Sequence, residues 1–95
     1  MWARVSTYEL AGQDLEEAIR GFERAVAQLR GMEGASDAYL LVDRGSGRAL
    51  TVTLWESEEA LAASEDAADR LRREASGDRV QSVDRYEVAF HQSFR

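Results

Sequence analysis

Residues 38–61 read AYLLVDRGSGRALTVTLWESEEAL, and this stretch decides the fold. Two segments in it, residues 38–43 and 48–56, are rich in the β-branched, leucine and aromatic side chains that strands favour. The intervening Arg44-Gly45-Ser46-Gly47 has the composition of a hairpin turn. The stretch therefore predicts a β-hairpin, and a helix is expected to follow it.

Two amphipathic helices are predicted on either side of this hairpin. Residues 14–30 place apolar side chains at steps of three and four, and Gly31 is expected to close the helix in a left-handed cap conformation. Ser57 can cap the second helix, which we expect to run to about Ala75. Its inward stripe is rich in alanine, so the helix can lie close to the sheet. The stripe comprises Ala60, Leu61, Ser64, Ala67, Ala68, Leu71 and Ala75.

Two further strands are predicted near the ends of the chain, at residues 2–10 and 79–91, where side chains alternate between two faces. The element order is then βαββαβ across a single domain, residues 1–95. In the right-handed split βαβ arrangement this order puts both helices on one face of a four-stranded antiparallel sheet, which is a ferredoxin-like α+β fold.

The opposite face of such a sheet would be bare and would carry aromatic and leucine side chains. A bare apolar face of this kind requires a cover. We therefore expect a homodimer that pairs through the sheet face and encloses a pocket beside each pair of helices.

Composition excludes several kinds of chemistry. The 95 residues include no cysteine and a single histidine, and all twelve basic residues are arginine. Disulfides, thiolate metal sites, two-histidine metal motifs, Schiff-base chemistry and the P-loop lysine are therefore excluded. The bias towards arginine and alanine is typical of a GC-rich bacterial genome.

Charge and hydropathy limit the partners. The net charge is −6, with arginines interleaved among acids, which argues against nucleic acid as a partner. The start of the chain lacks an apolar signal region, and no window is apolar enough to span a bilayer. We therefore expect a cytoplasmic protein without a membrane partner.

The residues from Gly31 to Leu61 resemble the antibiotic biosynthesis monooxygenase family of dimeric α+β barrels. The resemblance is carried by GMEGA at 31–35, the Gly-x-Gly turn, and LWESEEAL at 54–61. It implies a dimer with one pocket per subunit and, in some members, cofactor-independent oxidation of phenolic polyketides or haem breakdown. Trp55 corresponds to the family's pocket tryptophan. Many members place a histidine near the position of Ser64, so we expect no haem ligation and no cofactor here.

Several residues are candidates for a ligand site. Trp55, on the same strand face as Thr53, could form an aromatic wall, or it could be a core or interface residue. Arg4 and Ser6 share a face of the first strand, where Arg4 could hold an anionic or phenolic oxygen or form an interface salt bridge. Ser64 could point into a pocket or bond its own helix carbonyl.

The remaining candidates are weaker. Tyr39 and Phe22 could line the same cavity or simply belong to the core. His91 is the default proton acceptor at neutral pH, yet its place near the end of the chain also fits an exposed, inert side chain. The acidic pair Glu65-Asp66, like the other acidic runs, is interpreted as a helix dipole partner on a solvated face.

Two functions are consistent with this sequence. The first is a monooxygenase-like protein with a small aromatic-ligand pocket that oxidises a phenol or quinol with dioxygen and no bound cofactor. The second is a non-catalytic dimeric module that binds a small molecule or assembles with a partner. An open apolar pocket with converging polar groups would favour the first, and a cavity filled by its own side chains would favour the second.

Overall fold

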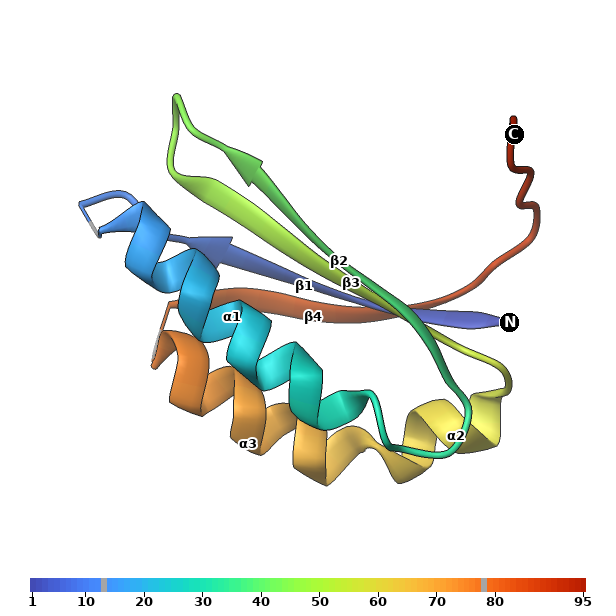
Figure 1. The fold of residues 1–95 in the computed structure, drawn as a ribbon. Helices are drawn as coiled ribbons and strands as arrows, with labels where there is room; N and C mark the ends of the chain where they lie inside the picture. Colours follow the sequence, from blue (N-terminus) through green and yellow to red (C-terminus); the bar gives the residue numbers. More distant parts are fainter. Residues whose placement is uncertain (13, 78) are drawn as a thin grey trace.

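The computed structural model describes residues 1–12, 14–77 and 79–95 and contains a sheet with helices packed against one side of it (Figure 1). The elements follow the predicted order, with the second helix divided into two. They are β1 (Trp2–Glu9), α1 (Leu15–Leu29), β2 (Ala35–Asp43), β3 (Arg48–Trp55), α2 (Glu58–Ala63), α3 (Glu65–Ser76) and β4 (Val80–Glu87).

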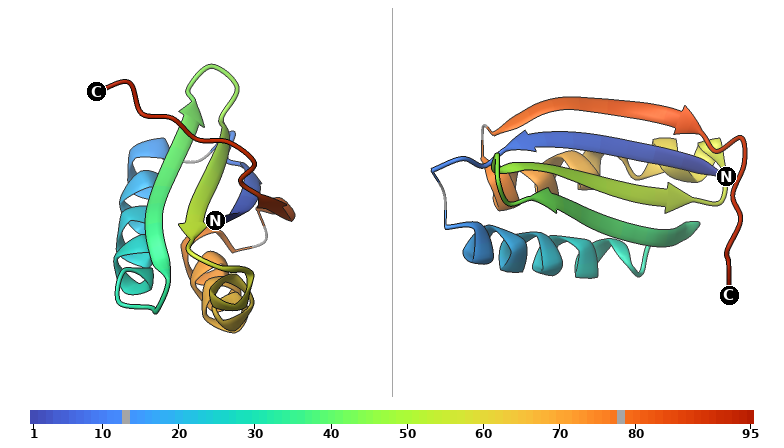
Figure 2. Two further views of the ribbon diagram at one scale, coloured as in Figure 1. Left: turned by 90° about the vertical axis from the view of Figure 1, so that its right-hand side faces the viewer. Right: turned by 90° about the horizontal axis from the view of Figure 1, so that it is seen from above.

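The four strands form one antiparallel sheet in the order β2-β3-β1-β4. Helices α1 and α3 run along the same face of this sheet, and the views in Figure 2 leave the other face without a helix. The fold is therefore the predicted ferredoxin-like α+β fold.

The strand register separates the side chains into two faces. Arg4 pairs with Thr53 and Trp2 pairs with Trp55, so these residues share the face that the helices cover. On the open face the same register aligns Val5 with Val52. Three large side chains on the open face are about half exposed: Tyr39 (53 %), Leu41 (50 %) and Tyr86 (55 %). The predicted bare apolar face is thus present in the single chain.

The core lies between the sheet and the two long helices at the end where β1 finishes. Tyr8 of β1 and Phe22 of α1 meet edge to face, with their ring centroids 4.8 Å apart. Leu10 and Ala49 complete the buried cluster. Gly47 closes the hairpin next to this cluster with φ 78°, and a Cβ there would lie 2.8 Å from the backbone of Ala11. The hairpin therefore needs glycine at this position.

The second helix is divided at Ser64, where the sequence predicted a continuous helix. Ser57 caps α2 by accepting a hydrogen bond from the Ala60 backbone N–H, as expected. The Ser64 N–H then donates to the carbonyls of both Ala60 and Leu61, which tightens the last turn before α3 begins. The division leaves the Leu61 carbonyl available to a side chain from the sheet.

Three local predictions are wrong. Gly31 does not have a positive φ and is not a left-handed cap; Gly34, after the helix, has φ 81°. The fourth strand ends at Glu87, so residues 88–91 lie outside it. A register shift between Thr7 and Tyr8 brings Val80 opposite Tyr8, on the covered face, where it packs against the core. Strict alternation along residues 79–91 put Val80 on the same face as Tyr86, which lies on the open side of the sheet.

The chain after β4 forms a tail that leaves the sheet beside the start of β1 and then crosses that end of the sheet (Figure 2). Two phenylalanines in the tail are highly exposed: Phe90 at 79 % and Phe94 at 92 %. None of the helices in the described part of the chain is long and apolar enough to cross a membrane.

Candidate functional site

The guanidinium of Arg4 is the polar centre of the covered face. Only 3 % of the residue is exposed. Its Nη2 donates to the Leu61 carbonyl at 2.9 Å, to Oγ of Ser64 at 2.8 Å and to Oε1 of Glu65 at 3.1 Å. The break between α2 and α3 supplies all of these acceptors. Burial lowers the pKa of Arg4, and its hydrogen bond to Glu65 opposes that effect.

Glu65 is shared between two arginines. Besides accepting from Arg4, it accepts from Arg85 of β4, whose Nη2 lies 2.6 Å from Oε2. The hydrogen bond from Arg85 and then that from Arg4 lower the pKa of Glu65 from 4.5 to about 2, although partial burial acts in the opposite direction. Glu65 is therefore ionised at neutral pH and fixes the position of one edge of the Arg4 guanidinium.

Trp55 lies beside Arg4 at the end of β3 and is 1 % exposed. Its indole Nε1–H donates to Oγ1 of Thr53 at 3.0 Å. The Cζ atom of Arg4 lies 5.7 Å from the centroid of the Trp55 ring, within the range of a cation–π interaction. The Trp55 ring is thus held by a hydrogen bond and by the arginine, below the surface of the molecule.

A small cavity of about 40 Å³ lies between the sheet and helices α1 and α3, and Arg4 is part of its lining. Hydroxyl groups of Ser6, Thr51 and Thr53 contribute to its polar wall, and Phe22 contributes to its apolar wall. A cavity of this size has room for about one or two water-sized groups and is too small for an aromatic ring.

A larger groove of about 420 Å³ opens beside this cavity, between the second half of α1 and the start of β2. Val26, Leu29 and Thr53 line both spaces, so the groove and the Arg4 cavity adjoin each other. Its volume lies in the range of small-molecule sites. The complete lining comprises Glu23, Val26, Ala27, Leu29, Arg30, Ala35, Ser36, Asp37, Ala38, Thr53, Leu54 and Trp55.

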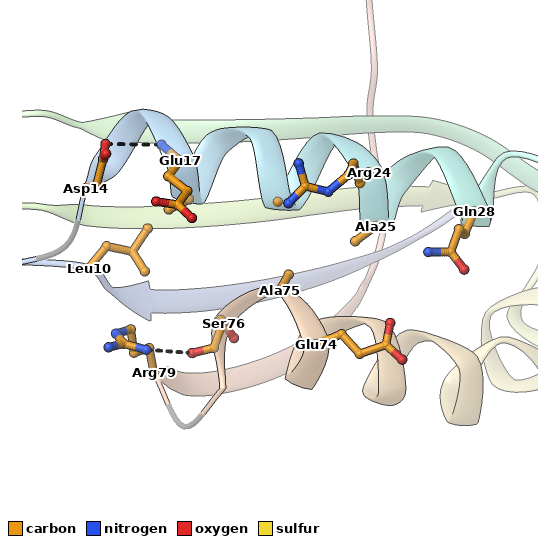
Figure 3. Close-up of a pocket in the computed structure, with 12 residues that line it drawn as sticks. Leu10, Asp14, Glu17, Arg24, Ala25, Gln28, Glu74, Ala75, Ser76 and Arg79 are labelled. Carbon is orange, nitrogen blue, oxygen red and sulfur yellow. Dashed lines mark hydrogen bonds between the residues drawn. The ribbon is translucent and has the colours of Figure 1, made fainter.

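A second cleft, of about 460 Å³, lies between α1 and α3 (Figure 3). Its walls carry charges of both signs, with Glu17 and Arg24 on α1 facing Glu74 on α3. These side chains are exposed to solvent, which satisfies them. We therefore interpret the cleft as a solvated boundary between two helices. The groove next to Arg4 is the better candidate for a ligand site.

Six of the predicted site residues lie on the covered face. Arg4, Ser6, Thr53 and Phe22 line the small cavity, Trp55 lies under the groove, and Ser64 bonds both Arg4 and the Leu61 carbonyl. Of the two alternatives considered for Ser64, the structure has the bond to its own helix carbonyl, and the hydroxyl also accepts from Arg4; Ser64 lines neither the groove nor the small cavity.

The other two predicted residues lie elsewhere. Tyr39 pairs with Val52 and points to the open face, so it does not share the cavity of Trp55. His91 is exposed on the tail, and a hollow of about 280 Å³ lined by both Tyr39 and His91 lies there. His91, the predicted proton acceptor, and Tyr39, a predicted cavity residue, thus lie together, but on the opposite side of the sheet from Trp55.

Sequence reasoning missed the charged residues that surround Arg4. Glu65 was interpreted as a dipole partner on a solvated face, yet it bonds Arg4 and Arg85. Arg72 was overlooked; it is 9 % exposed, lines the small cavity and donates to Asp69 at 3.0 Å. Position in the sequence could have indicated both residues, because Glu65 directly follows Ser64 and Arg72 directly follows Leu71, and Ser64 and Leu71 belong to the inward stripe.

No family model matches the chain. Two curated relatives, uncharacterized proteins from two strains of Mycobacterium tuberculosis, are each 33 % identical over 73 residues, which is 76 % of this chain and 33 % of the relative. The chain thus spans about a third of the length of the curated relatives it matches.

Solved structures match over nearly the whole chain. The haem degrader MhuD of Mycobacterium tuberculosis, solved with two haems in its active site, has a TM-score of 0.71 with 24 % identity and coverage of 98 % of this chain and 100 % of that one. A mutant of SnoaB, a cofactor-independent oxygenase of Streptomyces nogalater, gives 0.72 with 16 % identity and coverage of 98 % and 95 %. A protein of Nitrosomonas europaea assigned to the antibiotic biosynthesis monooxygenases gives 0.75 with 10 % identity, covering 97 % and 93 %. The chain therefore has the fold of the antibiotic biosynthesis monooxygenases, as the resemblance predicted.

The residues of the groove do not fit haem. A haem iron takes an axial histidine, cysteine, methionine or tyrosine in most proteins. None of the described residues that line the groove is of these types, and Ser64 offers only a hydroxyl that is already bonded. Nor do the described residues contain a group of three or more potential metal ligands.

Proposed function

We propose that this chain forms a homodimer that binds a small aromatic molecule in the groove between α1 and β2 and oxidises a phenol or quinol there with dioxygen. The observation that carries the proposal is the groove itself, an apolar space of about 420 Å³ that adjoins the small cavity lined by the buried Arg4. The fold that the chain shares with a cofactor-independent oxygenase supports the choice of reaction.

Arg4 gives the site a chemical role. A phenol reduces dioxygen far more readily as its phenolate, and a neighbouring guanidinium stabilises the anion through charge-assisted hydrogen bonds. In the monooxygenase form of the reaction, a ring CH₂ group next to the phenolate becomes a carbonyl. One oxygen atom enters the product, the other leaves as water with the two hydrogens, and the substrate supplies all the electrons.

The open face of the sheet supports the dimer. Tyr39, Leu41 and Tyr86 are each about half exposed there in the single chain. A second copy that packs its own open face against them would remove this apolar surface from water, at about 25 cal/mol for each Å² buried. The homodimer through the sheet face is thus part of the proposal.

One observation favours the second function, a binding module without chemistry. His91 lies on the tail, and the described lining of the groove and of the small cavity contains no histidine. Proton removal from the ligand would then depend on Arg4 and on solvent. A protein that binds but does not oxidise its ligand would fit this arrangement.

Oxygen uptake with a panel of anthrones and quinols, together with ligand binding, tests the proposal. Ala38 is exposed on β2 and lines the groove, so Ala38→Trp should fill it without disturbing the core and should abolish uptake. Ala62→Trp, on the exposed side of α2, is the matched control and should leave uptake unchanged. Equal uptake by both variants would exclude the groove as the site, and binding without uptake would favour the binding module.

A further inference from the structure

Three hydroxyl groups on the covered face of the sheet have no hydrogen-bond partner in the described part of the chain. They belong to Ser6 and Tyr8 of β1 and to Thr51 of β3. Ser6 and Tyr8 are each only 2 % exposed. A buried hydroxyl group that bonds neither protein nor water costs free energy, so such groups in folded proteins are nearly always paired.

The same three hydroxyl groups keep contact with open space. Among the described residues that are not exposed, the completely enclosed polar side-chain atoms without a partner are Nε and Nη1 of Arg4. The oxygens of Ser6, Tyr8 and Thr51 are therefore not completely enclosed. All three residues line the small cavity of about 40 Å³, so their hydroxyl groups face this space.

The strand register brings these groups within reach of one small molecule. Ser6 pairs directly with Thr51, and Tyr8 lies two residues further along the same face of β1. The Cβ atoms of directly opposite residues lie about 4.5–5.5 Å apart, so a molecule that makes two hydrogen bonds of about 2.8 Å can bridge their hydroxyl groups. The cavity has room for about one or two water molecules, each of which needs about two to four polar partners.

The rest of the lining favours a neutral guest. Side chains of α1 and α3, such as Leu71, form an apolar wall opposite the sheet. Arg4 and Arg72 also line the cavity. Their charges are already paired, with the carboxylates of Glu65 and Asp69 respectively. An anion is therefore not required, and the hydrogen bonds of a guest fall to the hydroxyl groups of the sheet.

We propose that the small cavity is a water site, in which one or two internal water molecules bridge the hydroxyl groups of Ser6, Tyr8 and Thr51. The water supplies the partners that the chain does not, and it joins β1 to β3 beneath the helices. The site lies directly beside the ligand groove, because Thr53 lines both spaces. It goes beyond the proposed function and depends neither on a ligand in the groove nor on oxidation.

Removal of one hydroxyl group gives a test whose sign depends on the water. Tyr8→Phe and Thr51→Val each delete a hydroxyl group with little change in shape. With water in the cavity, each variant loses a hydrogen bond, and the urea midpoint should fall by about 0.5 M. In a dry cavity, each variant would instead remove an unpaired buried hydroxyl group, and the midpoint should rise.

Matched exchanges on the open face of the sheet are the controls. Tyr86→Phe, at a 55 % exposed tyrosine, should leave the midpoint unchanged, and Thr7→Val should not lower it. The double variant that combines Tyr8→Phe with Thr51→Val should lower the midpoint by less than the sum of the two single shifts, because the two groups share bound water. All midpoints are measured by circular dichroism at one protein concentration.

Oxygen-17 magnetic relaxation dispersion of the solvent detects internal water directly and needs no variant. The wild-type protein should hold at least one water molecule for longer than the protein takes to tumble. Ala68→Val, which adds two methyl groups to the cavity wall on α3, should hold fewer, whereas Ala62→Val on the exposed side of α2 should match the wild type.

Three results would each overturn the water site. They are a wild-type protein without long-lived internal water, a Tyr8→Phe midpoint that does not fall, and a folded Ala68→Val variant that holds as much internal water as the wild type. The first two do not depend on whether Ala68→Val folds. Oxygen uptake and ligand binding in the groove are separate measurements, so failure of the water site leaves the proposed function in place.

Discussion

Replacement of Glu65 by glutamine should destabilise the fold in a manner that depends on pH. Glu65→Gln keeps the size of the side chain and a carbonyl acceptor but removes the charge that pairs with Arg4 and Arg85. The pKa of Glu65 is lowered from 4.5 to about 2. Each pKa unit is worth about 1.4 kcal/mol, which sets an upper bound of about 3.4 kcal/mol near neutral pH.

Solvent reduces this bound. The side chain of Arg85 is 48 % exposed and that of Glu65 is 30 % exposed, so part of the interaction is screened. Exposed ion pairs contribute about 0–1 kcal/mol, whereas the contact with Arg4 is buried on the arginine's side. We therefore expect Glu65→Gln to lower the free energy of unfolding by about 1–2 kcal/mol at about pH 7.

The pH dependence follows from the direction of the pKa change. A carboxylate whose pKa is lower in the folded state stabilises the protein fully above its unfolded pKa, here 4.5. That stabilisation is lost as the pH falls towards the folded pKa of about 2. The difference between wild type and Glu65→Gln should therefore be largest at neutral pH and should shrink between about pH 4.5 and about pH 2.

Urea unfolding followed by circular dichroism, at one fixed protein concentration, measures this difference across the pH range. Glu16→Gln serves as the control, because Glu16 pairs with Arg44 on the surface, where both side chains are more than half exposed. It should leave stability unchanged. A difference for Glu65→Gln that is the same at about pH 7 and about pH 2 would show that the ionic contacts are not its origin.

Two further predictions concern packing and assembly. Gly34→Ala should destabilise the fold by about 2 kcal/mol or more, because φ is 81° there and a Cβ would lie 2.4 Å from Cβ of Ala60. The control Gly31→Ala, with open space around it, should shift the urea midpoint little. Equal urea midpoints for the two variants would contradict the close approach of Gly34 to Ala60. Leu41→Asp puts a charge on the open sheet face and should halve the mass measured by light scattering, while Ala62→Asp on α2 should leave it unchanged. A wild-type protein that is already monomeric would refute the sheet-face dimer.

The strands and their faces could be predicted because the relevant signals are local. Alternation along residues 2–10 put Arg4 and Ser6 on one face of the first strand, and their pairing with Thr53 and Thr51 shows that this face is the one the helices cover. The glycine-containing turn fixed where the hairpin closes, and hence the register of β2 on β3. Element order then left few topologies that obey the handedness of the βαβ unit.

The errors arose where long-range contacts override local pattern. Ser64 fits a helical stripe as well as a helix break, and its role depends on a hydrogen bond from Arg4, sixty residues earlier in the chain. Val80 lies on the covered face because of a register shift opposite Tyr8, and alternation within one strand does not reveal such a shift. Tyr39 was grouped with Trp55 because both are aromatic, although the register places it on the opposite face.

The side chain of Arg4 illustrates why a site can be located from sequence before its chemistry is known. The alternation of β1 already puts this arginine on one face with Ser6, but it does not say which nitrogens find acceptors. That depends on Glu65, which is held by Arg85 on the far side and therefore meets Arg4 only at Nη2. Because Arg85 restrains it, Glu65 holds the Nη2 side of the Arg4 guanidinium in place against the break between α2 and α3.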